Sequence, residues 1–255
     1  FYRQGDYTFQ AFVRGLYDTR LGGQLADTIA NPYHIDLNTW RVEGFMKNGY
    51  VFDPISGSSV AVIVAASYHD QKNKYGNKAW NASQLNAYLN AIYQGNWEGG
   101  GLIDNDHRLS AGLSLNYDRY KENLSLLPLV LDRDEVTPGI FAEYSYTYAD
   151  QLSLVAGVRA DWSSRYGFFF TPRANVRYSP FAWWTLRGSV GMGYRSPNAI
   201  ADNAFIMPSA RQLILTENIK QERAVNAGVS TTFYIPMGSK ELQLFLCGHK
   251  IQKII

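Results

Sequence analysis

The chain has 255 residues, of which 46% are hydrophobic and 15% aromatic, and its formal net charge at pH 7 is +2. This length allows one large all-β domain, whereas no run of about 18 apolar residues is present to form a membrane-spanning helix. A charge so close to zero gives no electrostatic indication of nucleic-acid binding. The single cysteine, Cys247, excludes an internal disulfide bond.

Alternation of apolar and polar residues with a period of two predicts about eleven strands. In chain order they are expected at 5–17, 37–52, 57–69, 83–97, 105–118, 138–149, 151–163, 169–179, 183–195, 222–235 and 240–247. The fourth range also permits a helix, because Leu85, Tyr88, Leu89 and Ile92 have helical spacing. We retain the strand interpretation.

The alternation is strictest in the four strands between Pro138 and Arg195. One face of these strands is expected to be apolar and convex, and it includes Leu154, Val158, Val176, Leu186, Val190 and Tyr194. The opposite, concave face includes Arg159, Arg173, Arg177 and Arg187. The strands are therefore expected to have one apolar face and one face that carries arginines.

The apolar faces begin or end in Tyr or Trp, and the strands reach or exceed about ten residues, the length that crosses a bilayer when tilted. Aromatic rings with a polar tip suit the boundary between hydrocarbon and headgroups. These features favour a transmembrane β-barrel over the alternative, a soluble antiparallel domain with one solvated face.

The connectors are expected to be of two kinds. Tight turns are predicted at 53–56, 149–150, 180–182 and 236–239, with a Gly-rich turn at 98–104 on the same side. Longer polar connectors are predicted at 18–36, 70–82, 119–137 and 196–221, with a shorter one at 164–168. Short turns on one side and long loops on the other are typical of outer-membrane barrels.

No catalytic constellation is found in the sequence. Gly191-Met192-Gly193 has neither the third glycine nor the following helix of a dinucleotide fingerprint. The acidic group Asp132, Asp134 and Glu135 is expected to be a solvated loop cluster, with calcium coordination as the minor alternative. No Cys/His spacing resembles a zinc site, so we predict no catalytic residue, no metal and no cofactor, although the four histidines leave haem binding open.

Two segments support a family resemblance. The stretch 171–180 (TPRANVRYSP), followed by 184–198 (WTLRGSVGMGYRSPN), resembles the β-barrel of TonB-dependent outer-membrane receptors. The segment 217–222 (ENIKQE) is similar to the one that closes a long extracellular loop in that family, with Gln221 where the pattern usually has Pro. The resemblance covers 138–234 well and the upstream half loosely.

The resemblance implies a barrel of about 22 antiparallel strands with an N-terminal plug domain. This chain would supply about half of the wall, as an incomplete, open curved sheet without the plug. Residues 1–247 are expected to form the partial barrel domain, and 248–255 an irregular tail that suggests a truncated or frame-shifted product.

The resemblance further implies a receptor of the bacterial outer membrane, not an enzyme, that imports a large scarce nutrient with energy from TonB. Its partners would be outer-membrane lipid, the TonB complex acting through the missing plug, and a nutrient ligand such as an iron-siderophore, haem, cobalamin or oligosaccharide; no nucleic acid is expected. The alternatives are a passive porin-like barrel and a secreted all-β ligand- or sugar-binding domain.

Candidate site residues follow from the faces and the loops. The residues expected to line the lumen are Glu143, Arg159, Asp161, Arg173, Arg177, Arg187 and Arg195. The arginines would pair with Asp161, Glu143 or plug carboxylates, either to balance charge or to contact ligand. The residues expected to bind ligand are Tyr75, Trp80, Tyr166, Asn198 and Arg211. The connector 196–221 is expected to capture ligand, or to form a lid that packs through Phe205 to Pro208.

Overall fold

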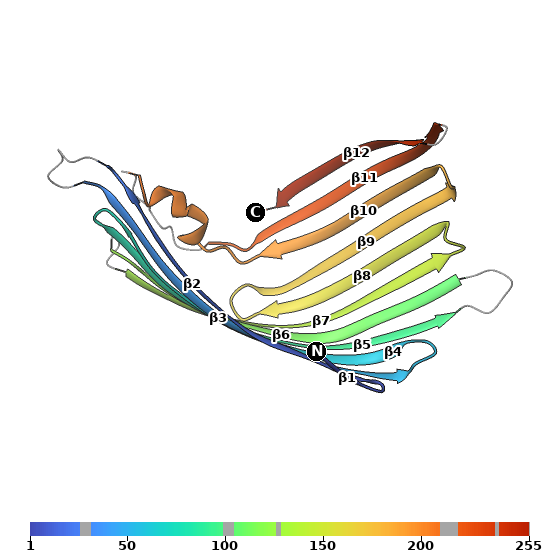
Figure 1. The fold of residues 1–255 in the computed structure, drawn as a ribbon, viewed down its shortest axis with the longest axis horizontal. Coiled ribbons are helices and arrows are strands. Elements are labelled where there is room, and N and C mark those ends of the chain that lie inside the picture. The colour runs from blue at the N-terminus through green and yellow to red at the C-terminus, as the bar shows by residue number, and fades with distance from the viewer. Residues whose placement is uncertain (26–31, 99–104, 126–128, 210–218, 238–239, 255) are drawn as a thin grey trace.

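The computed structural model is one antiparallel sheet in which twelve strands follow one another in chain order. It describes residues 1–25, 32–98, 105–125, 129–209, 219–237 and 240–254. Figure 1 shows the sheet curved into an open trough, with the 3-10 helix η1 (Ala201–Ile206) over its concave side. The predicted all-β class is confirmed. Within the described ranges, no helix has the length and apolar character needed to cross a bilayer.

The strands range from three to 21 residues in length. Their bounds are β1 Tyr2–Gln4, β2 Tyr7–Gly23, β3 His34–Asp53, β4 Ser58–Tyr75, β5 Lys78–Glu98, β6 Asn105–Leu124, β7 Leu129–Tyr148, β8 Leu152–Ser163, β9 Gly167–Phe181, β10 Trp184–Arg195, β11 Glu222–Met237 and β12 Lys240–Ile254. The segment that could have been helical, 83–97, lies within β5.

The pairing register extends the alternation of faces across the sheet, because directly opposed residues share a face. Ala142 of β7 lies opposite Val158 of β8, which lies opposite Pro172 of β9, so one face is apolar there. On the other face, Glu143 lies opposite Gly157, which lies opposite Arg173. The two predicted faces of 138–195 are therefore confirmed, with one exception at Tyr194 that is described below.

Aromatic residues border the apolar face at both ends of the strands. Near the tight turns the rings of Phe52 and Tyr93 stack at 6.0 Å, and near the other end those of Trp40 and Tyr68 lie 5.1 Å apart. From Trp40 to Tyr50 the distance along β3 is about 33 Å, or about 25 Å across a wall tilted by about 40°. That width matches the apolar band of a membrane barrel.

The strands are longer than predicted at the end opposite the tight turns. The predicted long connector 70–82 is wrong, because β4 and β5 continue through it and are joined by Gly76 and Asn77, with Gly76 at φ +60°. The predicted connector 119–137 is also too long, since β6 ends at Leu124 and β7 begins at Leu129. Beyond the apolar band neither face needs apolar residues, so the strands lose their alternation while their backbone ladder continues.

Two further predictions are corrected at the edges of the sheet. There are twelve strands rather than eleven in the described ranges, because the short β1 precedes β2. Residues 248–254, expected to be irregular, belong to β12 and pair with β11. The exposed N–H and C=O groups of β11 accept a neighbouring strand whatever its side-chain pattern.

Asp53 shapes the tight turn between β3 and β4. Its Oδ2 accepts a hydrogen bond of 2.7 Å from Ser56 Oγ, and its Oδ1 accepts one of 3.0 Å from the N–H of Ile55. Because both bonds favour the charged carboxylate, they lower the pKa of Asp53. This Asx-type turn explains why the sequence signal was clear here.

The two faces of β4 provide a test of the fold, because the sequence of this strand is apolar on both sides and only the register assigns them. Val64 pairs with Met46 and Leu89 on the apolar face, whereas Ser67 pairs with Glu43 and Asn86 on the polar face. Val64→Arg in the complete protein should lower the folded amount in membranes, since arginine near the bilayer midplane costs about 2–4 kcal/mol. Ser67→Arg should remain close to the unsubstituted protein.

Heat-modifiable migration on SDS gels measures the folded fraction of each variant. Equal losses in the Val64→Arg and Ser67→Arg variants would contradict the assignment of the two faces.

Candidate functional site

All seven residues that were predicted to line the lumen lie on the polar face of the sheet. They occupy alternate positions of β7, β8, β9 and β10, and the register brings them side by side. This is also the face against which the segment 196–209 packs, because residues of that segment bond to Arg133 and Glu135 of β7. The polar face is therefore the candidate functional site.

A buried ion pair lies on this face near the end of β8. Asp161 is 1% exposed, and it accepts hydrogen bonds from Arg159 Nη2 at 2.6 Å and from Arg159 Nε at 2.7 Å. Arg159 Nη2 also donates to Ser114 Oγ at 2.7 Å. The carboxylate occupies the space beside Gly139, where a Cβ atom would overlap it. The pair is satisfied on both sides, as a buried charge requires.

Tyr194 lies on the polar face, not on the apolar face where the alternation placed it. Its hydroxyl donates to Asp161 Oδ2 at 3.4 Å, and its ring centroid lies 3.7 Å from that of the buried Phe169. The pairing of β9 with β10 ends at Arg173 and Gly191. Beyond that point β10 remains paired with β11, up to Arg195 and Glu222, but is no longer paired with β9, so the register between β9 and β10 does not determine the face of Tyr194.

The other arginines of the polar face divide into two groups. Arg173 forms an ion pair with Glu143 across Gly157, as predicted, while Arg195 pairs with Asp202 and Glu222 instead of Asp161 or Glu143. Arg177 and Arg187 have no carboxylate partner in the described part of the chain. The predicted pairing with Asp161, Glu143 or plug carboxylates is thus confirmed for Arg159 and Arg173, whereas the partners of Arg195 were not among those predicted.

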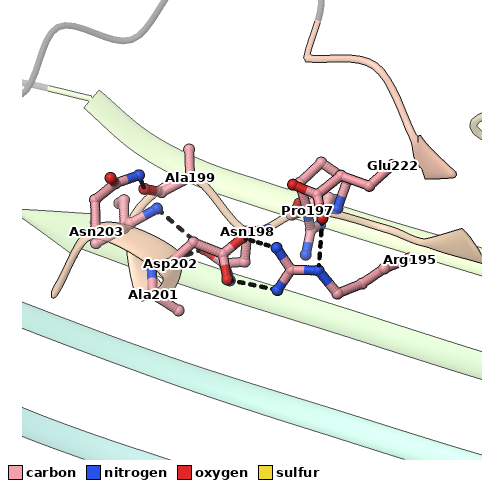
Figure 2. A network of polar contacts seen from close by, with 10 residues as sticks. Arg195, Pro197, Asn198, Ala199, Ala201, Asp202, Asn203 and Glu222 are labelled. Atoms are coloured by element: carbon pink, nitrogen blue, oxygen red, sulfur yellow. Dashed lines mark hydrogen bonds and ion pairs between the residues drawn. The ribbon is translucent and has the colours of Figure 1, made fainter. Parts of the chain in front are cut away.

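Figure 2 shows how Arg195 joins the end of β10 to the segment that follows it. Its Nη1 and Nη2 donate to the two carboxylate oxygens of Asp202 at 2.7 and 3.0 Å, and its Nε lies 3.1 Å from Glu222 Oε2. The Asp202 carboxylate also accepts the N–H of Asn198 at 3.0 Å. A bidentate contact of this kind fixes η1 relative to β10 and β11.

The segment 196–209 packs into a small apolar cluster at the same end of the sheet. Ile200 and Met207 are 1% and 3% exposed, and they contact Trp80 of β5 and Leu124 of β6. Phe205, by contrast, is 66% exposed. The segment is therefore packed against the wall, as the lid alternative expected. Met207 lies within the predicted range 205–208 and carries part of this packing, whereas Ile200 was not predicted and Phe205 is exposed.

Polar contacts hold the same segment along its length. Arg133 Nη1 donates to the carbonyl of Pro197 at 2.7 Å, and its guanidinium lies 4.4 Å from the Tyr120 ring centroid. Glu135 Oε1 accepts hydrogen bonds from Ser163 Oγ at 2.6 Å and Ser196 Oγ at 3.1 Å. Both hydrogen bonds to the segment come from β7, and Glu135 links the segment on to Ser163 of β8.

The residues predicted to bind ligand are placed as follows. Trp80 is buried in the apolar cluster, and Tyr75 packs against it. Asn198 Oδ1 accepts the N–H groups of Ile200 and Ala201, each at 3.1 Å, so it shapes the start of η1. Tyr166 is partly exposed and its N–H donates to Ser163 Oγ at 3.1 Å, while Arg211 lies outside the described residues.

Structural roles that the sequence did not reveal belong to Leu124, Arg133 and Ile200. The only available signal was the presence of apolar residues inside a polar connector. Among the described residues, no group of three or more His, Cys, Asp or Glu side chains is placed to hold a metal ion.

Ile200→Asp in the complete protein should release the segment 196–209 from the wall, because a charge would enter a site that is 1% exposed. Phe205→Asp is the matched control, since Phe205 belongs to the short helix that Ile200 precedes but is 66% exposed. Limited proteolysis of the folded protein should cut the segment faster in the first variant only. Equal cleavage rates would show that the apolar cluster does not hold the segment.

Arg159→Met should destabilise the folded protein by about 3 kcal/mol or more, because it leaves the Asp161 carboxylate buried without a counter-charge. Arg173→Met is the control, since the Arg173 side chain is 62% exposed and its pair with Glu143 should contribute less than about 1 kcal/mol. Urea unfolding of the protein in lipid vesicles measures both. A smaller loss for Arg159→Met than for Arg173→Met would refute this account.

Comparison with known proteins places this geometry in a family. The family model described as TonB dependent receptor-like, beta-barrel matches residues 1–240. No curated protein matches the chain. Among solved structures, the siderophore receptor PirA from Pseudomonas aeruginosa matches with a TM-score of 0.56 and 13% identity, over 98% of this chain and 50% of that one.

Two other structures are similar in fold. The hemophore receptor HasR of Serratia marcescens, solved with its hemophore HasA and heme, has a TM-score of 0.63 and 12% identity, over 97% of this chain and 45% of that one. The alcaligin outer-membrane receptor FauA of Bordetella pertussis has a TM-score of 0.61 and 13% identity, over 90% of this chain and 38% of that one. The chain spans half or less of the length of these three proteins.

At such identities the solved structures show a shared fold, whereas the family model covers nearly the whole chain. The chain belongs to the TonB-dependent receptor-like β-barrel family, whose members are bacterial outer-membrane proteins, and its open sheet is part of such a barrel.

Proposed function

We propose that this chain forms part of the barrel of an outer-membrane receptor that imports an iron chelate or haem with energy from TonB. The observation that carries the proposal is the family match over residues 1–240. Structures of similar fold include a siderophore receptor and a hemophore receptor solved with heme, which supports this class of ligand. The family is one of receptors for nutrient uptake, and this favours import over the passive porin and the secreted binding domain.

The partners follow from the two faces. The apolar face, with its aromatic borders, would contact outer-membrane lipid, and the polar face would line the passage. Coupling to TonB would act through a plug segment that is not part of the sheet. Arg159 and Arg173 of the polar face are held in ion pairs, which supports a wall that presents fixed charges to whatever fills the barrel.

Ligand capture would take place at the end of the barrel where the segment 196–209 packs. The bonds of Arg195, Arg133 and Glu135 hold this segment in place, while Phe205 within it stays exposed. Capture on a rigidly held loop is a common arrangement. Trp80 would contribute by supporting the segment rather than by touching ligand, since its side chain is buried.

The test uses the complete receptor in a bacterial strain that lacks its own iron-chelate receptors. Under iron limitation, the receptor should restore uptake of labelled ferric siderophore or growth on haem, and deletion of TonB should abolish it, because import through a plugged barrel needs energy. A strain that lacks the receptor but keeps TonB is the control. Uptake that persists without TonB would establish the passive-barrel alternative.

A further inference from the structure

Two arginines on the polar face oppose each other rather than a carboxylate. Arg187 of β10 lies directly opposite Arg177 of β9, so both side chains leave the sheet on the same face at neighbouring positions. Like charges placed in this way repel each other. Arg187 Nη1 donates to Thr232 Oγ1 at 3.3 Å, whereas Arg177 forms no hydrogen bond or ion pair with any residue that the structure describes.

Five other arginines of the same face form ion pairs with carboxylates, whereas Arg108 bonds to Asn96 and Arg133 to the carbonyl of Pro197. The pairs are Arg14 and Arg41 with Glu43, Arg159 with Asp161, Arg173 with Glu143, and Arg195 with Asp202 and Glu222. The wall therefore balances its cations at these places. At Arg177 and Arg187 it leaves two adjacent positive charges facing the concave side.

The two arginines lie in a groove of about 430 Å³ near the tight turn that joins β9 and β10. Asn175, Ser189 and Ser230 line the groove beside them, and each carries a side-chain hydrogen-bond donor. None of the described residues that line it is acidic. The groove thus combines two full positive charges with several donors and offers no internal counter-charge.

We propose that Arg177 and Arg187 hold one oxyanion between them, a carboxylate or phosphate group of a small solute that enters the barrel. The planar fork of each guanidinium matches the two oxygens of such a group, and an anion shared by both arginines offsets their mutual repulsion. The hydroxyls of Ser189 and Ser230 and the amide of Asn175 complete the donor set. This site goes beyond the proposed import function, because it binds whether or not the solute is transported.

The experiment titrates the purified complete receptor, in detergent at low ionic strength, with citrate and separately with inorganic phosphate, and measures binding by calorimetry. The test variant is Arg177→Gln/Arg187→Gln. The matched control is Lys47→Gln, which removes a cation from the same face on β3, where Lys47 lies opposite Gln10 and Ile63. Heat-modifiable migration verifies that each variant is folded, and these exposed positions make folding of the double variant the expected result.

The unsubstituted receptor should bind at least one of the two anions. The double variant should bind it about tenfold more weakly or worse, because charge-assisted hydrogen bonds are lost, while Lys47→Gln should change affinity by less than about twofold. Tighter binding of citrate identifies the solute group as a carboxylate, and tighter binding of phosphate identifies it as a phosphate. Arg177→Lys/Arg187→Lys keeps the charge without the planar fork, so its affinity should be intermediate.

Three results would overturn the site: no binding by the unsubstituted receptor, unchanged binding by the double variant, or equal weakening by Lys47→Gln, which would indicate a diffuse field rather than a site. Uptake of iron chelates is measured separately in cells. Failure of anion binding therefore leaves the proposed import function untouched, and failure of import leaves the anion site standing.

Discussion

The continuous ladder of backbone hydrogen bonds between neighbouring strands is the constraint on which the rest of the structure depends. Because the twelve strands pair in chain order, the face of any one residue fixes the faces of its neighbours across the sheet. Strand β4, whose sequence is apolar on both sides, receives its faces from β3 and β5 in this way. One surface suited to lipid and one suited to water follow from the register alone.

Once the faces are fixed, the concave side must accommodate its charges. The wall does so with short-range ion pairs whose partners sit on the same or an adjacent strand, such as Arg159 with Asp161 and Arg14 with Glu43. A glycine beside the pair gives the carboxylate room, as Gly139 does for Asp161. Arg177 and Arg187 differ from these pairs, because they lie directly opposite each other and neither has a carboxylate partner among the described residues.

The sequence was informative where a bilayer constrains it. Between Pro138 and Arg195 the alternation predicted both faces, because hydrocarbon tolerates no polar side chain on one side of the strand. Outside the apolar band this constraint is absent, so the polar extensions of β4 to β7 were mistaken for loops. Tyr194 shows a second limit, since the pairing of β10 with β9 ends before it and no local pattern encodes such a tertiary event.

The candidate site, like the fold, could be predicted from the sequence only in part. The arginines of the polar face follow from the alternation, but their partners do not, because Asp202 and Glu222 reach Arg195 only after the chain has folded back over the sheet. Burial of Trp80 by Ile200 and Met207 is equally non-local, since the contacting residues are far apart in the chain. Trp80 was therefore predicted to contact ligand because it is an aromatic residue near a predicted loop, whereas in the structure it supports the segment 196–209.

The edges of the sheet determine how these conclusions apply to the whole receptor. Strands β1 and β12 each have one row of backbone N–H and C=O groups without a partner strand in the described sheet. In hydrocarbon an unsatisfied group of this kind costs several kcal/mol, so an open sheet of this length cannot remain in a bilayer alone. The family relatives of similar fold are at least about twice as long as the matched region, which is enough chain to close a barrel. The stability of each ion pair and of the packed segment 196–209 is therefore a property of the closed barrel, in which the polar face is enclosed and its charges are less screened by water.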